Sequence, residues 1–166
     1  MSAREITRNQ AGGLHLGRKD GLFTVEARIF LPRPPEIVFP FFADAGNLET
    51  ITPPWLRFEI VTPRPIAMRA GALIEYRLRL HGFPLRWQSE ITAWEPPHRF
   101  VDEQRQGPYR AWIHEHIFTE SKGGSEMRDF VRYAAWGGWL VERLFIRQDV
   151  RRIFEYRARR LQETFE

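Results

Sequence analysis

The stretch from Tyr109 to Tyr133 constrains the fold most strongly, because it carries the pattern of two strands joined by a tight turn at Ser121–Gly124. Glycines in that turn supply the backbone angles that a tight hairpin requires. Successive side chains of a strand point to opposite faces. Folding the pair about Lys122–Gly123 therefore predicts four neighbours on one shared face: Phe118 with Met127, His116 with Asp129, His114 with Val131, and Trp112 with Tyr133.

This shared face is large and mostly apolar, yet it holds two histidines and an aspartate. The opposite face has the composition of a solvated surface, with a few apolar residues interspersed: Arg110, Glu115, Thr119, Glu126, Arg128 and Arg132, with Ile113, Ile117 and Phe130. A sheet that only packs against a core needs no imidazole or carboxylate on its buried side. We therefore expect this face to line a cavity that is apolar in most places and polar at a few.

Length and composition indicate one globular domain with a roomy interior. The chain has 166 residues, of which 13 are Phe and six are Trp, and such large side chains suit the walls of a cavity. The absence of cysteine excludes disulfides and thiolate chemistry, and it fits a reducing compartment, so we expect a cytoplasmic protein. The first residues lack the apolar run of a signal peptide. The longest uncharged apolar run, Ala134–Val141, is far shorter than the roughly 20 residues of a membrane helix.

The net charge of +4 and the abundance of arginine raise nucleic acid and acidic membranes as partners. The arginines, however, are spread along the chain and interleaved with acidic residues, for example Asp149, Glu155 and Glu163 near the C-terminus. Such mixed charge is typical of solvated strand and helix faces. We therefore expect no specific nucleic-acid partner, and the sequence does not indicate an oligomeric state.

The N-terminal half begins with a tail over residues 1–21, with a short extended piece at Leu14–Leu16, and the domain is expected to span residues 22–166. Alternating side chains predict a first strand at Phe23–Leu31, which the prolines after it end. Two short helices should follow at Glu36–Ala43 and Asp44–Thr52, the second capped by Asp44 or Asn47.

The rest of the chain predicts a meander of strands and one long helix. Four strands precede the central hairpin: Leu56–Thr62, Ala72–His81, Leu85–Trp94 and Arg99–Arg105. Their pairing places Asp102 beside His114 and Gln104 beside Trp112. After Gly137 and Gly138 the period changes to 3.6 residues, with an apolar stripe at Trp139, Leu140, Ile146, Val150, Ile153, Phe154, Ala158, Leu161 and Phe165. The prediction is an α+β fold in which a seven-stranded antiparallel sheet wraps around a long C-terminal helix.

Five pieces of the chain resemble one known superfamily: ARIFLPRPPEIVFPFFAD, NLETITPPWL, WEPPHRFVDEQ, GPYRAWIHEHIF and GGSEMRDFVRY. They resemble the START-like (SRPBCC) superfamily, specifically its small bacterial polyketide-cyclase-like or coenzyme-Q-binding-like proteins. The resemblance runs from about residue 22 to the end of the chain. It implies the helix-grip fold and a hydrophobic ligand cavity, but it does not imply one activity.

The candidate ligand-binding residues are those that pattern and pairing direct toward the cavity: Tyr76, Trp87, Asp102, Gln104, Trp112, His114, His116, Asp129, Tyr133 and Phe154. The two histidines, with Asp129 or Asp102 as a third ligand, have donor types that suit zinc or iron. The alternative is a hydrogen-bonded His–Asp pair that supports the cavity wall. The resemblance carries no metal with it, so we expect neither a metal nor another cofactor.

Two functions remain open, and the sequence favours the first. In one, the cavity binds a lipid, quinone or polyketide-like molecule, and the protein acts as a carrier or sensor. In the other, the protein is a cofactor-free cyclase or dehydratase in which His114, His116 and Asp129 perform acid–base catalysis.

The segment from Trp136 to Trp139 also allows two interpretations. It is either a joint that lets the terminal helix lift or a plain connection from strand to helix. Its two tryptophans also suit a transient contact with a membrane.

Overall fold

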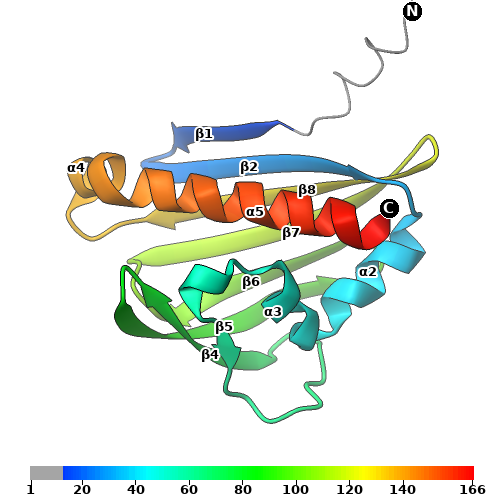
Figure 1. Ribbon diagram of the computed structural model, residues 1–166, viewed down its shortest axis with the longest axis horizontal. Coiled ribbons are helices and arrows are strands. Elements are labelled where there is room, and N and C mark those ends of the chain that lie inside the picture. Colours follow the sequence, from blue (N-terminus) through cyan, green and yellow to red (C-terminus); the bar gives the residue numbers. More distant parts are fainter. Residues whose placement is uncertain (1–12) are drawn as a thin grey trace, which may run out of the picture.

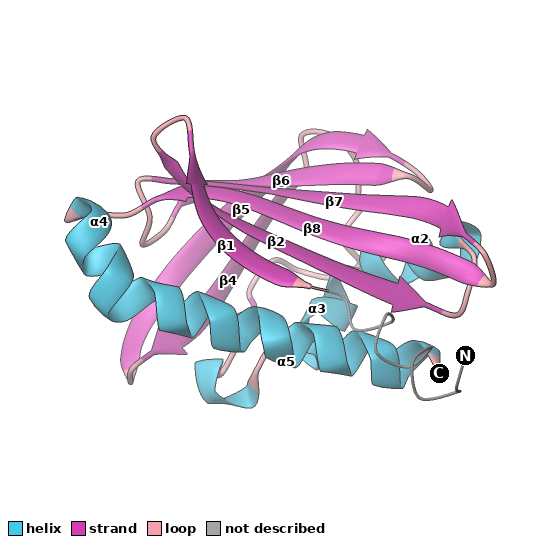
Figure 2. Ribbon diagram, turned by 90° about the horizontal axis from the view of Figure 1, so that it is seen from above, coloured by secondary structure: helices cyan, strands magenta, loops and turns pink. Residues whose placement is uncertain are grey.

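An eight-stranded antiparallel sheet curves around one long C-terminal helix (Figures 1 and 2). The computed structural model describes residues 13–166. The strands lie in the order β1-β2-β8-β7-β6-β5-β4-β3, so β2 joins the edge strand β1 to β8, and the meander from β8 back to β3 completes the sheet. This arrangement is the predicted α+β helix-grip fold, with one strand more than expected.

In the described part of the chain, two strands come first and short helices follow. Six more strands then complete the sheet, and the helical segments after β8 end the chain. The strands are β1 (Leu14–Lys19), β2 (Leu22–Leu31), β3 (Glu59–Ile60), β4 (Leu73–Leu80), β5 (Phe83–Glu95), β6 (Arg99–Gln106), β7 (Ala111–Ser121) and β8 (Gly124–Ala134). The helices are α2 (Pro35–Ala43), α3 (Leu48–Ile51), α4 (Gly138–Val141) and α5 (Arg147–Phe165), with 3₁₀ turns η1 (Ala45–Asn47) and η2 (Pro54–Leu56) and a π-helical turn η3 (Glu142–Ile146).

The central hairpin has the predicted register. All four predicted pairs, including His116 with Asp129, are ladder partners of β7 and β8. Gly123 in the turn has a φ of 83°, a conformation that only glycine adopts without strain. On the other side of β7, Asp102 of β6 pairs with His114 as predicted. The face that carries the histidines is therefore the inner face of the sheet.

The eighth strand is β1, which lies within the segment predicted to be a tail. It pairs with β2 along its whole length, from Leu14 with Ala27 to Lys19 with Leu22. Its side chains are half-buried or exposed. An edge strand is held by backbone hydrogen bonds, and these leave no apolar alternation in the sequence to predict it. Residues 1–12 of the predicted tail lie outside the described residues.

The region after the first helix differs in detail from the prediction. The expected second helix is divided into η1 and α3, and Asp44 caps it by accepting a hydrogen bond from the Gly46 amide at 2.8 Å. The strand expected at Leu56–Thr62 shrinks to β3, because the prolines at positions 53 and 54 start a 3₁₀ turn that ends in the left-handed residue Arg57.

The terminal helix packs on the sheet only through its second part. Val150, Phe154 and Leu161 of α5 are buried, as the apolar stripe predicts. Trp139 and Leu140 were expected on the same stripe, but they are 58% and 52% exposed. The physical reason is the π-helical turn, which shifts the phase of the helix between α4 and α5. No helix among residues 13–166 is long and apolar enough to cross a membrane.

Candidate functional site

A layer of polar side chains crosses the interior between two apolar clusters. On β7, His114 and His116 lie between Trp112 and Phe118, and on α5 Arg157 lies between Phe154 and Leu161. On β8, the carboxylate at position 129 lies between residues of the same two clusters. The polar layer is therefore built by the two strands of one hairpin, β7 and β8, and by the C-terminal helix α5.

Asp129 is the centre of this layer. Its side chain is fully buried, and it accepts contacts from His116 Nδ1 at 2.7 Å, His114 Nε2 at 3.1 Å and Arg157 Nε at 3.0 Å. Burial raises the pKa of this carboxyl, but the positive charges of Arg157 and His116 and the hydrogen bond from His114 outweigh burial and hold the pKa well below its usual range. Asp129 is therefore a carboxylate at neutral pH.

His116 has a carboxylate on each side of its ring. Its Nε2 lies 3.0 Å from Asp102 Oδ2, while its Nδ1 faces Asp129. A carboxylate oxygen only accepts hydrogen bonds, so the two carboxylates favour the imidazolium form of the ring, in which both nitrogens carry a proton. Burial lowers the pKa of His116, but Asp129 and Asp102 reverse this effect and raise the pKa above its ordinary value.

His114 has the opposite character. Burial and the charge of His116, whose ring centroid lies 3.8 Å away, lower the pKa of His114 against the opposing effect of Asp129. The ring is therefore neutral, and its Nε2 donates to Asp129. Its Nδ1 lies 3.8 Å from Asp102 Oδ2, beyond hydrogen-bond distance, and is left as a lone-pair acceptor.

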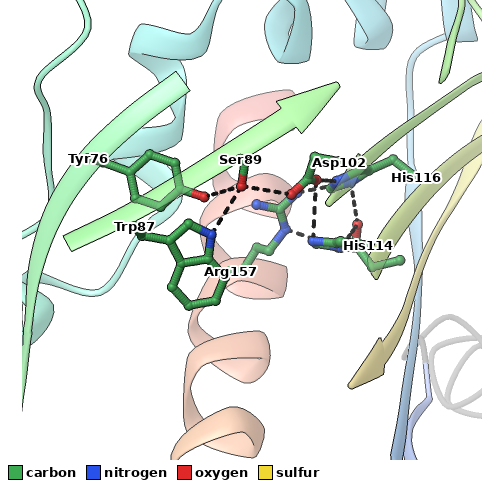
Figure 3. A network of polar contacts seen from close by, with 8 residues as sticks. Tyr76, Trp87, Ser89, Asp102, His114, His116 and Arg157 are labelled. Carbon is green, nitrogen blue, oxygen red and sulfur yellow. Dashed lines mark hydrogen bonds and ion pairs between the residues drawn. The ribbon is translucent and has the colours of Figure 1, made fainter. Parts of the chain in front are cut away.

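A second arm of the network reaches from Asp102 to the far side of the cavity (Figure 3). Ser89 Oγ lies 3.5 Å from Asp102 Oδ1, and the Ser89 oxygen receives the indole N–H of Trp87 at 3.1 Å. Tyr76 OH lies 2.6 Å from the same oxygen and donates to it, because the Ser89 proton points to Asp102. Burial and the charge of Asp102 raise the pKa of Tyr76, so its hydroxyl stays protonated.

Arg157 and Ser89 are site residues that the sequence interpretation did not include. Arg157 is only 7% exposed and lies on the buried side of α5, with its guanidinium 5.6 Å from the centroid of the Phe42 ring. The sequence does indicate that Arg157 is buried, because its position follows the helical spacing of the apolar stripe Val150, Phe154 and Leu161. Ser89 shares a strand face with Trp87. A small polar residue among apolar ones does not by itself indicate a binding residue, so the sequence did not predict it.

The formal charges of the layer cancel. Asp102 and Asp129 supply two negative charges, and Arg157 and the His116 imidazolium supply two positive ones. Burial raises the pKa of Asp102 too, but the hydrogen bond from His116 and the charges of His116 and Arg157 lower it overall, so this group is also ionised. The protein thus satisfies its own buried charges, and the polar layer presents a neutral surface.

A cavity of about 230 Å³ lies between the sheet and α5. Its walls are mostly apolar, and the polar layer reaches it through Tyr76, Ser89, Asp102, His114, His116 and Arg157. Asp44, Thr52 and Asp149 line it elsewhere. A second hollow, of about 490 Å³, lies along β1, β2 and α5 and is lined by three exposed arginines and Glu155 together with apolar residues such as Leu14 and Trp55. Because the first cavity carries the buried polar layer, it is the candidate site.

Seven of the ten predicted ligand-binding residues line this cavity: Tyr76, Trp87, Asp102, Trp112, His114, His116 and Phe154. Gln104, Asp129 and Tyr133 do not reach its wall. Gln104 bonds the backbone of Tyr109 through both ends of its amide, and Tyr133 donates to the buried carboxylate of Glu142 at 2.9 Å. Asp129 lies behind the two imidazoles and acts on the cavity only through them.

Three of these groups are close enough to share one metal ion. The nearest ligand atoms of Asp102, His114 and His116 lie within 4.8 Å of one another. However, Asp102 already pairs with His116, and the guanidinium of Arg157 lies 3.5 Å from His116 Nδ1. A cation would have to displace the first contact and tolerate the second charge, so we keep the expectation that no metal binds here.

The comparison with protein families gives one match over residues 23–166. The matching family is described as polyketide cyclase / dehydrase and lipid transport. No curated protein matches the chain significantly.

Several solved structures share the fold. Protein Ms6760 from Mycobacterium smegmatis superposes with a TM-score of 0.67 at 18% identity, covering 92% of this chain and 97% of that one. Protein CV1439 from Chromobacterium violaceum has a TM-score of 0.69 at 13% identity, with coverages of 86% and 96%. Ginseng major latex-like protein 151 from Panax ginseng has a TM-score of 0.64 at 10% identity, with coverages of 87% and 98%. At these identities the likeness concerns the fold alone.

We predict that Asp129→Asn lowers the free energy of unfolding by about 3–5 kcal/mol, because it leaves the buried charges of Arg157 and His116 without their shared partner. Denaturant unfolding measures the loss. The matched control is Glu126→Gln on the same strand, whose side chain is 48% exposed and whose loss should stay within about 0.5 kcal/mol. Adding Arg157→Met to Asp129→Asn should restore part of the stability. Equal losses in Asp129→Asn and Glu126→Gln would contradict the assignment.

We also predict opposite titrations for the two neighbouring histidines. Because the folded-state pKa of His116 is raised, its stabilising contribution is complete below about pH 6.5 and is lost as the pH rises through the raised pKa. The destabilisation caused by His116→Gln should therefore be largest in acid and decrease with rising pH, whereas the exposed His98→Gln should change little. Histidine NMR should show His114 titrating below the ordinary pKa and His116 above it. Two ordinary titrations would refute this.

Proposed function

Because the chain belongs to the polyketide cyclase/dehydrase and lipid transport family, we propose that it binds one small hydrophobic molecule between the sheet and α5. In this proposal the protein acts as a carrier or a sensor of that molecule. The supporting observation is the cavity itself, whose wall is mostly apolar and is reached by the polar layer. Apolar walls with a few placed polar groups are typical of small-molecule sites.

The neutral polar layer favours a ligand whose polar end is also neutral. A ligand carboxylate would meet Asp102 in a buried setting, where the two negative groups repel each other strongly. His114 Nδ1, in contrast, is a free acceptor that suits the O–H of an alcohol, a phenol or an enol. We therefore propose a lipid, quinone or polyketide-like ligand with a neutral oxygen at one end.

A second candidate function is cofactor-free cyclisation or dehydration, favoured by the opposite pKa shifts of two adjacent imidazoles. Such divergence is typical of acid–base pairs. The neutral His114 would take a proton from the carbon beside a ligand carbonyl, and Asp129 would stabilise the imidazolium that forms. The resulting carbanion would bond to a second carbonyl carbon of the same ligand, whose oxygen would recover the proton from His114. His116, with both N–H groups already held, would hold its charge fixed and leave the proton transfer to His114.

The same proposal includes no specific nucleic-acid partner. Five of the six arginines on α5 have partners within the protein: Arg147 with Glu142, Arg152 with the ring of Trp55, Arg157 with Asp129, Arg159 with the ring of Tyr156, and Arg160 with Glu163. A helix that bound nucleic acid would hold such groups free for phosphates.

Filling the cavity tests the binding function. Leu78 lines the cavity, whereas Leu73, on the opposite face of β4, is 49% exposed. We expect wild-type protein to bind a fluorescent apolar probe, and a long-chain alcohol to displace it better than the fatty acid of equal length. Leu78→Trp should weaken probe binding at least about tenfold, and the matched Leu73→Trp should leave it unchanged, with circular dichroism to verify folding of both. Equal binding by the two variants would refute the cavity as the site.

The enzymatic alternative has a separate test on His114. If wild-type protein converts a carbonyl-bearing ligand, His114→Gln should lower kcat about 10²- to 10⁴-fold and change the dissociation constant little. A carrier shows binding in the same assay and no product with either protein. Full turnover by His114→Gln would exclude the proton transfer proposed here.

A further inference from the structure

The segment from Trp136 to Phe145 exposes a dense group of large apolar side chains. The exposed fractions are 65% for Trp136, 58% for Trp139, 52% for Leu140, 60% for Leu144 and 65% for Phe145. The segment comprises the joint after β8, helix α4 and most of η3, which lie at one end of the molecule (Figure 1). Single exposed apolar residues are ordinary, but a contiguous group of this kind usually marks an interaction surface. We call these five residues the apolar tip.

The helical part of the apolar tip buries a charged side chain and exposes apolar ones, which is the reverse of the usual arrangement. Glu142 is only 3% exposed and points inward, where its carboxylate accepts the hydrogen bond from Tyr133 OH. Leu144 and Phe145, which follow Glu142 after Arg143, face outward. Folding alone favours the opposite arrangement, because burying a carboxylate and exposing apolar surface both cost free energy. The reversal indicates that the exposed apolar side chains meet another apolar medium.

Two exposed arginines lie beside the apolar tip. They are Arg110, whose guanidinium lies 5.6 Å over the ring of Trp136, and Arg143. Arg147 follows one helical turn later and is half-buried, 3.9 Å from Glu142. The next acid along the helix, Asp149, is already paired with His81 at 2.7 Å. An apolar surface with a rim of arginines is complementary to apolar chains beneath negative headgroups.

We propose that the apolar tip docks on the surface of an anionic lipid bilayer. Tryptophan side chains prefer the interface between headgroups and hydrocarbon, leucine and phenylalanine side chains bury in the outer hydrocarbon, and arginines pair with lipid phosphates. The segment is too short to cross the bilayer, so the protein lies on the surface. A second copy of the chain fits less well, because a symmetric contact would set Arg110 and Arg143 of one copy against the same arginines of the other.

The location of the apolar tip also connects it to the cavity. Ile146, directly after Phe145, and Tyr109, directly before Arg110, both line the cavity. A protein docked in this way holds one part of the cavity wall against the bilayer surface. This consequence for ligand exchange rests on the proposed binding function, whereas docking itself does not.

Vesicle flotation of the full chain tests the docking. Wild-type protein should float with vesicles that contain phosphatidylserine, float much less with phosphatidylcholine alone, and lose binding as salt rises. The double variant Leu144→Ser/Phe145→Ser should bind at least about tenfold more weakly, because each substitution removes an apolar side chain that would be buried in the bilayer. Arg143→Glu should also weaken binding. The matched control is Ile37→Ser, at a residue 56% exposed on α2, which should bind like wild type.

Further readouts separate this proposal from ligand binding and from self-association. Leu78→Trp should lose the apolar probe and still float, and Leu144→Ser/Phe145→Ser should keep the probe and its melting temperature. Flotation that is equal for wild type and the double variant would overturn the proposal. So would a wild-type dimer in light scattering that becomes a monomer in the double variant while neither protein floats, because the tip would then be an interface between copies.

Discussion

The structure of the site depends on one carboxylate with three donors. Asp129 receives two imidazoles from β7 and the guanidinium of Arg157 from α5, so a single buried group ties the two central strands to the helix that closes the cavity. It also decides the protonation of its neighbours. By fixing Nδ1 of His116 as a donor and Nε2 of His114 as a donor, it leaves Nδ1 of His114 as the free acceptor at the cavity.

Burying such a layer of charges costs free energy that a protein with only a structural role has no need to spend. Replacing a buried ion pair by apolar groups of similar volume is often neutral or stabilising, so the charges of Asp129 and Arg157 are weak evidence for a role in stability. Apolar clusters lie on both sides of the layer and hold its side chains in place. This arrangement suits the recognition of a polar group at one position along an otherwise apolar ligand, which is why we place the function in this cavity.

The parts of the site that lie on one hairpin were predictable from sequence. The turn at Gly123 and the two-residue period set the register, and the register brings His116 to Asp129 and Asp102 to His114. Contacts between distant elements were not predictable in this way. Arg157 lies on a helix whose rotation relative to the sheet depends on packing, and its buried position was visible only as an arginine on an apolar stripe.

Local departures from regular structure explain the other differences. The π-helical turn η3 rotates α4 relative to α5, so Trp139 and Leu140 leave the stripe on which a uniform period places them. Gln104 was expected beside Trp112, but its amide satisfies the backbone of Tyr109, a contact that strand alternation does not contain. Strand β1 is held by backbone hydrogen bonds to β2. Its side chains beyond Leu16 are exposed, so no apolar alternation predicted the full strand.

Native mass spectrometry of the protein, released gently from the cells that make it, tests the central claim most directly. We predict a mass excess of one neutral organic molecule per chain, which is absent from Leu78→Trp, where the cavity is filled, and present in Leu73→Trp, where it is not. The same excess in both variants, or only the bare mass of the chain in every preparation, would contradict a ligand held in this cavity.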